Sequence, residues 1–328
     1  MSPLTEDTQA ILLLTAPLLT GKKSPSATKP LSLAEYIALA EVLRSRGSTP
    51  AALLGAYADA FIDEYARNDN ERERVHALLS RGFALAQARD VWMSRSIWVM
   101  SRADAAYPRR LKSRLGKNAP PVLYGCGDKQ LLQGGGVAVV GSRDADDDAL
   151  RFAQVVGRVT HEAGMSVVSG GARGVDQAAV SACTDAGGSA VVVLADTLAK
   201  ASVSAAYRSA LRAGRVLLVS PYDPSASFNV GNAMQRNKFI YAFADIGVVA
   251  SSSLERCGAW AGAVEQLEKL HFVPMFTRAS DNDALVALRR MGARALPEDM
   301  TPSSMEALVH EAAACASSHP MVQKSFAL

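Results

Sequence analysis

Two loops rich in small residues contain the side chains in this chain best suited to bind an anion. A short apolar run leads into Gly141, Ser142 and Arg143, and a second apolar run leads into the loop 169–174 about thirty residues later. Glycine lets backbone N–H groups approach an anion closely, and a following helix adds the positive end of its dipole. Arginine adds paired donors that match a phosphate. Side by side, the two loops predict a composite site for a phosphodiester.

A third segment, 235–238, places two cations around an amide at the start of an apolar helix, which suits contacts to a nucleic-acid backbone and bases. The competing interpretation is that the glycines make tight turns and that the cations are merely solvated. The candidate phosphate- and DNA-binding residues are Gly141, Ser142, Arg143, Ser169, Gly170, Gly171, Arg173, Gly174, Arg236, Asn237 and Lys238.

Two further residues have more than one interpretation. Asp176 caps the helix that follows the second loop or orients Arg173, and a catalytic carboxylate is the minor alternative. Trp260 lies in the small-residue run 258–263, where it stacks on a base or packs a helix against the sheet. Neither loop fits the P-loop pattern of nucleotide hydrolases or the glycine pattern of dinucleotide enzymes.

The alternation of apolar runs and helical stretches predicts the elements that position these loops. Continuous β-branched runs are typical of parallel strands covered on both faces, and their alternation with helices predicts a doubly wound, mainly parallel, Rossmann-like sheet. Ligands of such sheets bind outside the carboxyl ends of the strands. Strands are expected at 137–140, 165–168, 190–194, 216–219, 246–250 and 272–276, and helices at 147–163, 175–186, 204–212, 233–244, 259–270 and 281–291.

The rest of the chain suggests a small all-helical domain at residues 1–90, a connector at 91–135, the Rossmann-like domain at 136–300 and a weakly helical or disordered tail at 301–328. Helices are expected at 5–19, 33–46, 49–65 and about 75–89, with a charged link at 68–74. The connector contains extended segments punctuated by prolines.

Bulk composition limits the function classes. The 328 residues have a net charge of only +3, so a nucleic-acid site must be a local cluster rather than a basic coat. Scattered cysteines and histidines predict reduced thiols and no metal site. No apolar run is long enough to span a membrane, and no leader pattern opens the chain, so we expect a soluble cytoplasmic protein. We also expect no cofactor.

The order and spacing of several motifs resemble the DprA/Smf family of DNA-processing proteins from about residue 30 to about residue 297. The shared motifs are Asp104-Ala-Ala-Tyr-Pro-Arg-Arg-Leu111, Pro120-Pro-Val-Leu-Tyr124, residues 137–143, residues 169–176, Gly187-Gly188, Arg236-Asn-Lys238, Val273-Pro274 and Gly292-Ala293. The resemblance implies a helical SAM-like domain before an extended Rossmann-like domain. It also implies single-stranded DNA binding, delivery of the strand to a RecA-type recombinase in natural transformation, homodimerisation and no catalysis.

The chain departs from the family pattern at several positions. Val180 replaces a histidine, Lys238 replaces the last arginine of an Arg-Asn-Arg segment, and Met275 replaces a glycine. The family's Phe-Pro is missing, and the segment 228–234 stands in its place. The run 258–262 also differs, and the tail is too short for a complete winged helix. These departures indicate a divergent branch.

Two alternative functions remain open from the sequence. One is an antitoxin or regulator in a phage-defence locus that neutralises a phosphoribosyltransferase-like toxin protein. The other is a nucleotide phosphoribohydrolase-like enzyme, for which the run 257–262 with Glu265 is a poor match to the expected loop.

Overall fold

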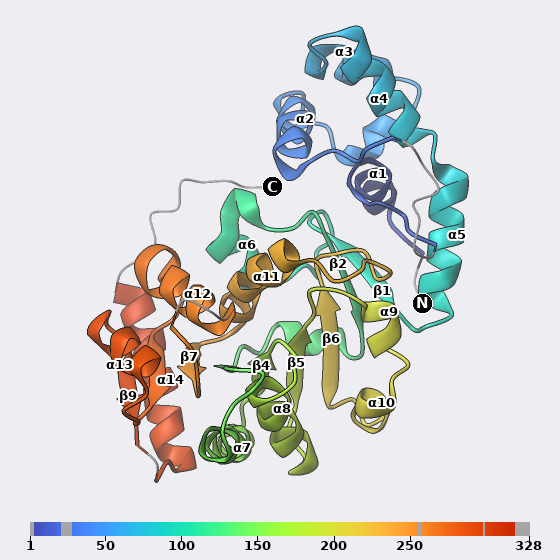
Figure 1. Cartoon of the computed structure of the whole chain (residues 1–328). Coiled ribbons are helices and arrows are strands. Elements are labelled where there is room, and N and C mark those ends of the chain that lie inside the picture. The colour runs from blue at the N-terminus through green and yellow to red at the C-terminus, as the bar shows by residue number, and fades with distance from the viewer. Residues whose placement is uncertain (1–2, 21–27, 255–257, 298, 319–328) are drawn as a thin grey trace.

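The computed structural model describes residues 3–20, 28–254, 258–297 and 299–318 as a mixed α/β protein with N-terminal helices (Figure 1). A nine-stranded sheet lies at its centre in the order β1-β2-β6-β5-β4-β3-β7-β8-β9. The strands from β6 to β9 in that order are parallel, and β1 and β2 are antiparallel at one edge. The predicted fold class is therefore confirmed.

All six predicted strands are present in the parallel part of the sheet. β3 has the predicted ends, the other strands differ from expectation by at most three residues at either end, and the largest shift moves β8 past Pro274. The strands are β1 (Trp98–Ser101), β2 (Val122–Cys126), β3 (Val137–Val140), β4 (Val167–Ser169), β5 (Ala190–Val193), β6 (Val216–Ser220), β7 (Ile246–Val249), β8 (Met275–Arg278) and β9 (Arg294–Leu296).

Helices cover both faces of the sheet, so the strands are buried on both sides as their continuous apolar runs require. Val137 and Val139 face one core with α7, α8 and α14, whereas Ala138 and Val140 face a second core with α6, α11 and α13. The helices after β1 are α6 (Arg109–Leu115), α7 (Asp147–Glu162), α8 (Val175–Asp185), α9 (Leu198–Ala201), α10 (Ala205–Arg212), α11 (Val230–Phe243), α12 (Gly258–Glu265), the π-helical η4 (Gln266–Leu270), α13 (Asp283–Arg290) and α14 (Pro302–Ser318), with short 3-10 turns η2 (Gly116–Asn118) and η3 (Lys129–Leu132).

The N-terminal helices gather at one end of the molecule, beside the β1–β2 edge (Figure 1). The expected helix at 49–65 is two pieces, because the chain leaves helical geometry at Gly55. The link expected at 68–74 is wrong: the Asn68 side chain accepts a hydrogen bond from the Glu71 N–H and starts a helix there. The elements are α1 (Glu6–Thr15), α2 (Leu33–Ser45), η1 (Pro50–Leu54), α3 (Ala58–Tyr65), α4 (Asp69–Leu79) and α5 (Gly82–Met93).

The segment expected to be a connector contributes two strands and a helix to the α/β unit. β2 pairs with β6, β1 pairs with β2, and α6 packs on α11. The tail is helical through Ser318, with Met305 fully buried, and the remaining tail lies outside the described residues. Cys126 and Cys183 are free and buried. None of the described helices is long and apolar enough to cross a membrane.

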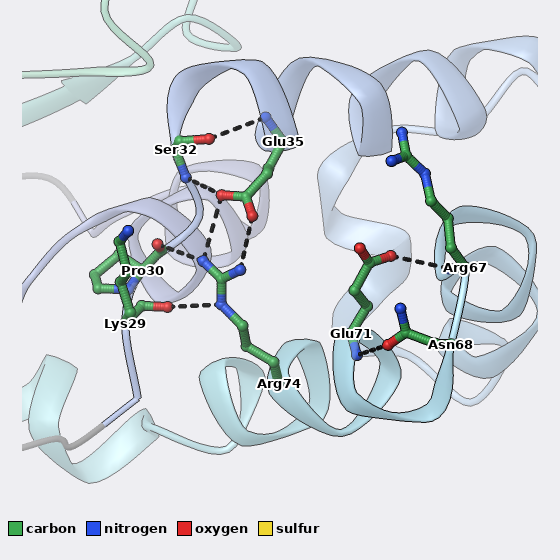
Figure 2. A network of polar contacts seen from close by, with 8 residues as sticks. All are labelled: Lys29, Pro30, Ser32, Glu35, Arg67, Asn68, Glu71 and Arg74. Carbon is green, nitrogen blue, oxygen red and sulfur yellow. Dashed lines mark hydrogen bonds and ion pairs between the residues drawn. The ribbon is translucent and has the colours of Figure 1, made fainter.

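One polar network joins α2 to α4 (Figure 2). Ser32 and Glu35 form a capping box, in which the Glu35 carboxylate accepts from the Ser32 N–H at 2.6 Å. The Arg74 guanidinium donates to both oxygens of Glu35 at 2.7 and 3.3 Å, and to the carbonyls of Lys29 and Pro30. The hydrogen bonds from Arg74, and then that from the Ser32 backbone, lower the pKa of Glu35 to about 2.

This network predicts an acid-sensitive contribution to stability. Because the folded pKa of Glu35 lies below its ordinary value of 4.5, the contribution is present above pH 4.5 and is lost as the pH falls towards 2. We expect Glu35→Gln to lower the free energy of unfolding at pH 7 by only about 0.5 kcal/mol, because the pair is partly exposed. Thermal unfolding of both proteins from pH 7 to pH 2.5 checks this: the difference in midpoint should shrink with acid, and a constant difference would contradict it.

Candidate nucleic-acid interface

The predicted site residues meet at the carboxyl ends of β3, β4 and β5, where the start of α11 crosses over them. The order of the sheet reverses at β3, since β4 lies on one side of it and β7 on the other. This is the place in an open α/β sheet where loops separate and ligands bind. The backbone joins the loops directly, because the Ser142 N–H donates to the Ser251 carbonyl at 3.1 Å and Val175 N–H donates to the Ser142 carbonyl at 3.3 Å.

Arg236 is the central side chain of this site. It is only 7% exposed, and its Nη1 donates to the Val193 carbonyl at the end of β5 at 2.9 Å. Nε and Nη2 have no hydrogen-bond partner among the described residues. Burial lowers the pKa of Arg236, although the nearby charge of Asp176 opposes this effect. A buried cation with spare donors is favourably placed to receive an anion.

Asp176 holds the second loop in shape. Its side chain is 5% exposed, and one carboxylate oxygen accepts from the N–H groups of Gly170 at 3.2 Å and Ala172 at 3.4 Å. Burial raises the pKa of Asp176, and the positive charge of Arg236 acts in the opposite direction. This role differs from both main predictions, because α8 has no side-chain cap and Asp176 binds N–H groups of the loop before the helix. Arg173 instead pairs with Asp144, and both side chains are exposed.

Most glycines of the loops are required by close packing inside the protein. A Cβ on Gly170 would lie 1.5 Å from Arg236 Nη1, and one on Gly141 would lie 2.6 Å from the Val175 side chain. Gly174 has φ +86° and approaches the Ser142 carbonyl, where a Cβ would lie at 2.4 Å. Thus these glycines interlock the two loops and the buried arginine, rather than leaving open space for a ligand.

The groups still available to an anion lie at the outer side of the second loop. The N–H groups of Gly171, Arg173 and Gly174 have no hydrogen-bond partner within the described part of the chain. They precede α8, whose dipole favours negative charge at this end. Arg143 is exposed, and its guanidinium lies 5.8 Å from the centre of the Phe228 ring.

Several of the other predicted residues form hydrogen bonds within the protein. Ser169 is fully buried and donates to the Val139 carbonyl at 2.6 Å, and Ser142 Oγ accepts from the Asp144 N–H at 3.2 Å. Asn237 is buried, and its amide donates to the Gly258 carbonyl at 2.7 Å, which ties α11 to α12. We therefore assign Ser169 and Asn237 to holding the site together rather than to touching DNA.

The segment that includes Lys238 and Trp260 lies on the α11–α12 side of the site. Lys238 is half-buried and donates to Gln235 at 2.6 Å, and burial lowers its pKa while the charge of Glu265 opposes this. Trp260 is partly buried and packs against the core of that face, in keeping with the packing interpretation. Glu265 is thus a charge partner of Lys238.

Three aromatic residues at the site, Tyr207, Tyr222 and Phe228, were not predicted as site residues from the sequence. Tyr222 donates to the Asn232 carbonyl at 3.1 Å, and burial raises its pKa to about 12 while Arg236 lowers it. Tyr207 reaches Gly171, where a Cβ would lie 2.8 Å from its hydroxyl. Phe228 is 53% exposed. Tyr222 directly follows a strand end, so that position was a usable signal, whereas Tyr207 and Phe228 are brought in by tertiary packing.

Two cavities in the described part of the chain lie elsewhere. One of about 370 Å³ lies between α1, α5 and β1, and one of about 360 Å³ lies between α2 and the loop at Arg102. At the candidate interface, Arg143 and Arg173 are exposed and Gly171 and Gly174 are partly exposed, which suits a polymer better than an enclosed small molecule. The described residues contain no cluster of three or more metal-ligating side chains.

Comparison with known proteins identifies the family. The profile of the family described as DNA recombination-mediator protein A matches residues 98–303, which is more than half of the chain. The chain belongs to this family. Its members are DNA-processing proteins, and the resemblance seen in the sequence motifs is thereby confirmed. No curated protein matches the chain in a sequence search.

Solved structures support the same fold. The X-ray structure of DNA processing protein A from Streptococcus pneumoniae superposes with a TM-score of 0.69 at 19% identity, covering 93% of this chain and 98% of that one. DNA processing protein A from Helicobacter pylori superposes with a TM-score of 0.54 at 21% identity, covering 66% of this chain and 96% of that one. The first match spans the N-terminal helices as well as the sheet.

The close approach of Gly170 to Arg236 gives a prediction that tests the geometry of the site. Gly170→Ala forces the buried guanidinium to move, so we expect a loss of about 2 kcal/mol in the free energy of unfolding. In an Arg236→Ala background the added methyl group has room, and the cost of Gly170→Ala should fall below about 0.5 kcal/mol. Urea denaturation of the four proteins in the cycle measures both values.

Gly134→Ala is the matched control, because a Cβ at Gly134 meets nothing within 4 Å. It should leave stability unchanged. Equal costs of Gly170→Ala with and without Arg236 would rule out the packing described here.

Proposed function

We propose that the protein binds single-stranded DNA and acts as a recombination mediator by binding rather than by catalysis. The observation that carries the proposal is the arrangement around Arg236: spare donors of a buried arginine lie beside exposed Arg143 and the unpaired N–H groups of Gly171, Arg173 and Gly174. These groups are donors and cations of the kind that contact phosphates. Arg143 and Arg173 are exposed, whereas Arg236 lies buried behind them.

An exposed aromatic ring supports a single-stranded ligand over a duplex. Phe228 is 53% exposed and contacts the Arg143 guanidinium, so a ring and a cation are presented together. Unpaired bases stack on such surfaces without strong sequence preference, whereas paired bases are already stacked. The Helicobacter pylori relative, whose published description concerns its single-stranded DNA binding mode, supports the same ligand class.

Salt dependence and charge reversal test this proposal. We expect wild-type binding of labelled oligo-dT, followed by fluorescence anisotropy, to weaken steeply between roughly 50 and 200 mM salt. Arg143→Glu should weaken binding about tenfold at the lower salt concentration and reduce the slope of log K against log salt by about 0.7, because a phosphate contact on a single strand is lost.

Arg158→Glu on α7 is the matched control, since Arg158 is exposed and has no ion pair in the described structure. Its affinity should equal that of the wild type. Salt-independent binding, or equal effects of Arg143→Glu and Arg158→Glu, would contradict the proposed site.

The mediator role makes a separate prediction. If the bound strand is handed to a RecA-type recombinase, the wild-type protein should shorten the lag before DNA-dependent ATP hydrolysis on strands coated with single-strand-binding protein. Arg143→Glu should not. If the wild-type protein binds DNA but leaves this lag unchanged, the mediator role is contradicted. That result would favour the alternative, an antitoxin whose partner is a toxin protein. Homodimerisation, which the family resemblance implies, stays a prediction for sedimentation analysis.

A further inference from the structure

A basic segment of the chain lies between the end of β5 and the loop after β6. Residues 197–222 contain four cations and no acidic residue, whereas the whole chain has 35 cations against 32 acids. Two of the four, Arg208 and Arg212, lie on α10. We propose that the outer face of α10 binds the sugar–phosphate backbone of a strand that leaves the pocket, which extends the interface. This inference rests on the proposed function.

The N-terminal half of α10 adjoins the second loop. The hydroxyl of Tyr207 lies 2.8 Å from where a Cβ on Gly171 would be, and the ring is partly buried against the core. Burial raises the pKa of Tyr207, with the charge of Asp176 adding to the effect, so the hydroxyl belongs to the same electrostatic environment as Arg236. A strand that passes Gly171 therefore meets α10 next.

Arg208 and Arg212 are positioned to continue a backbone track. They are four residues apart, so they lie on the same side of the helix with a rise of about 6 Å between them. Both side chains are exposed, and neither has a hydrogen bond or ion pair with any described residue. By contrast, Arg151 and Arg294 are neutralised by Asp148 and Glu311. Unpaired cations hold mobile counterions, whose release on binding favours a polyanion.

The surface around these arginines is accessible to a polymer. None of the residues of α10 is buried, and the turn before it, residues 202–204, contains two serines and Val203, which is 53% exposed. Helix α10 lies with α9 beside β6 (Figure 1). Close approach of an extended backbone is therefore possible along the helix.

Oligonucleotide length separates the α10 track from the pocket. Labelled oligo-dT of about 6 nucleotides should occupy the pocket alone, whereas about 20 nucleotides should reach α10 as well. We expect Arg208→Glu/Arg212→Glu to weaken binding of the long strand about tenfold and to reduce its salt slope by about 1.4, at roughly 0.7 per contact. Binding of the short strand should change less than twofold.

The matched control is Arg158→Glu/Arg290→Glu, which makes the same change in charge at two exposed, unpaired arginines on α7 and α13. It should leave the affinity for both strands unchanged. Equal losses for short and long strands in the α10 variant would overturn the track, as would unchanged long-strand binding. If the α10 track is overturned but Arg143→Glu still loses binding of the short strand, the proposed function remains supported. If the wild-type protein binds neither strand, both the α10 track and the proposed function are refuted.

Discussion

The burial of one guanidinium group constrains the whole functional edge of this protein. Placing the charge of Arg236 out of water is costly unless hydrogen-bond acceptors and negative charges around it compensate. The Val193 carbonyl accepts from it, and the negative charge of Asp176 opposes the burial penalty. The space it occupies exists because residue 170 has no side chain. One interaction thus fixes α11 over β4 and β5 and determines the identity of a loop residue far away in sequence.

The loops around this arginine pack against one another and do not form separate phosphate-binding sites. The carboxylate of Asp176 accepts hydrogen bonds from the N–H groups of Gly170 and Ala172, and Gly174 packs on the Ser142 carbonyl. What stays free is a smaller set of donors at the rim. This arrangement separates a rigid interior, which sets the shape, from an exposed rim of cations, amides and Phe228 that can contact a flexible polymer. Rigidity in the interior reduces the ordering cost when a strand binds.

The N-terminal region is integrated with the sheet rather than attached to it by a linker. β1 and β2 extend the sheet towards α1, and the Thr8 hydroxyl of α1 lies 2.8 Å from the Ser101 hydroxyl at the end of β1. Asp223, in the loop after β6, accepts from the Leu19 N–H at 3.0 Å, and burial raises its pKa to about 6. The loop that carries Tyr222 is therefore connected to the helical region by a buried carboxylate.

The sequence alone determined the α/β class, six of the strands and the region of the site, because buried parallel strands are continuous β-branched runs and their loops carry small residues and arginine. It also carried the motifs of the family. It did not determine the helix at Asp69, because a charged run hides the start signal given by the Asn68 cap. It indicated extended segments at β1 and β2 but not their place in the sheet, which arises because β1 pairs with β2 and β2 pairs with β6. The roles of single residues were decided by tertiary structure. Asn237 and Ser169 turned inward, Arg173 paired with Asp144, and Tyr207 and Phe228 joined the site, because hydrogen-bond partners and burial arise from segments that are distant in sequence.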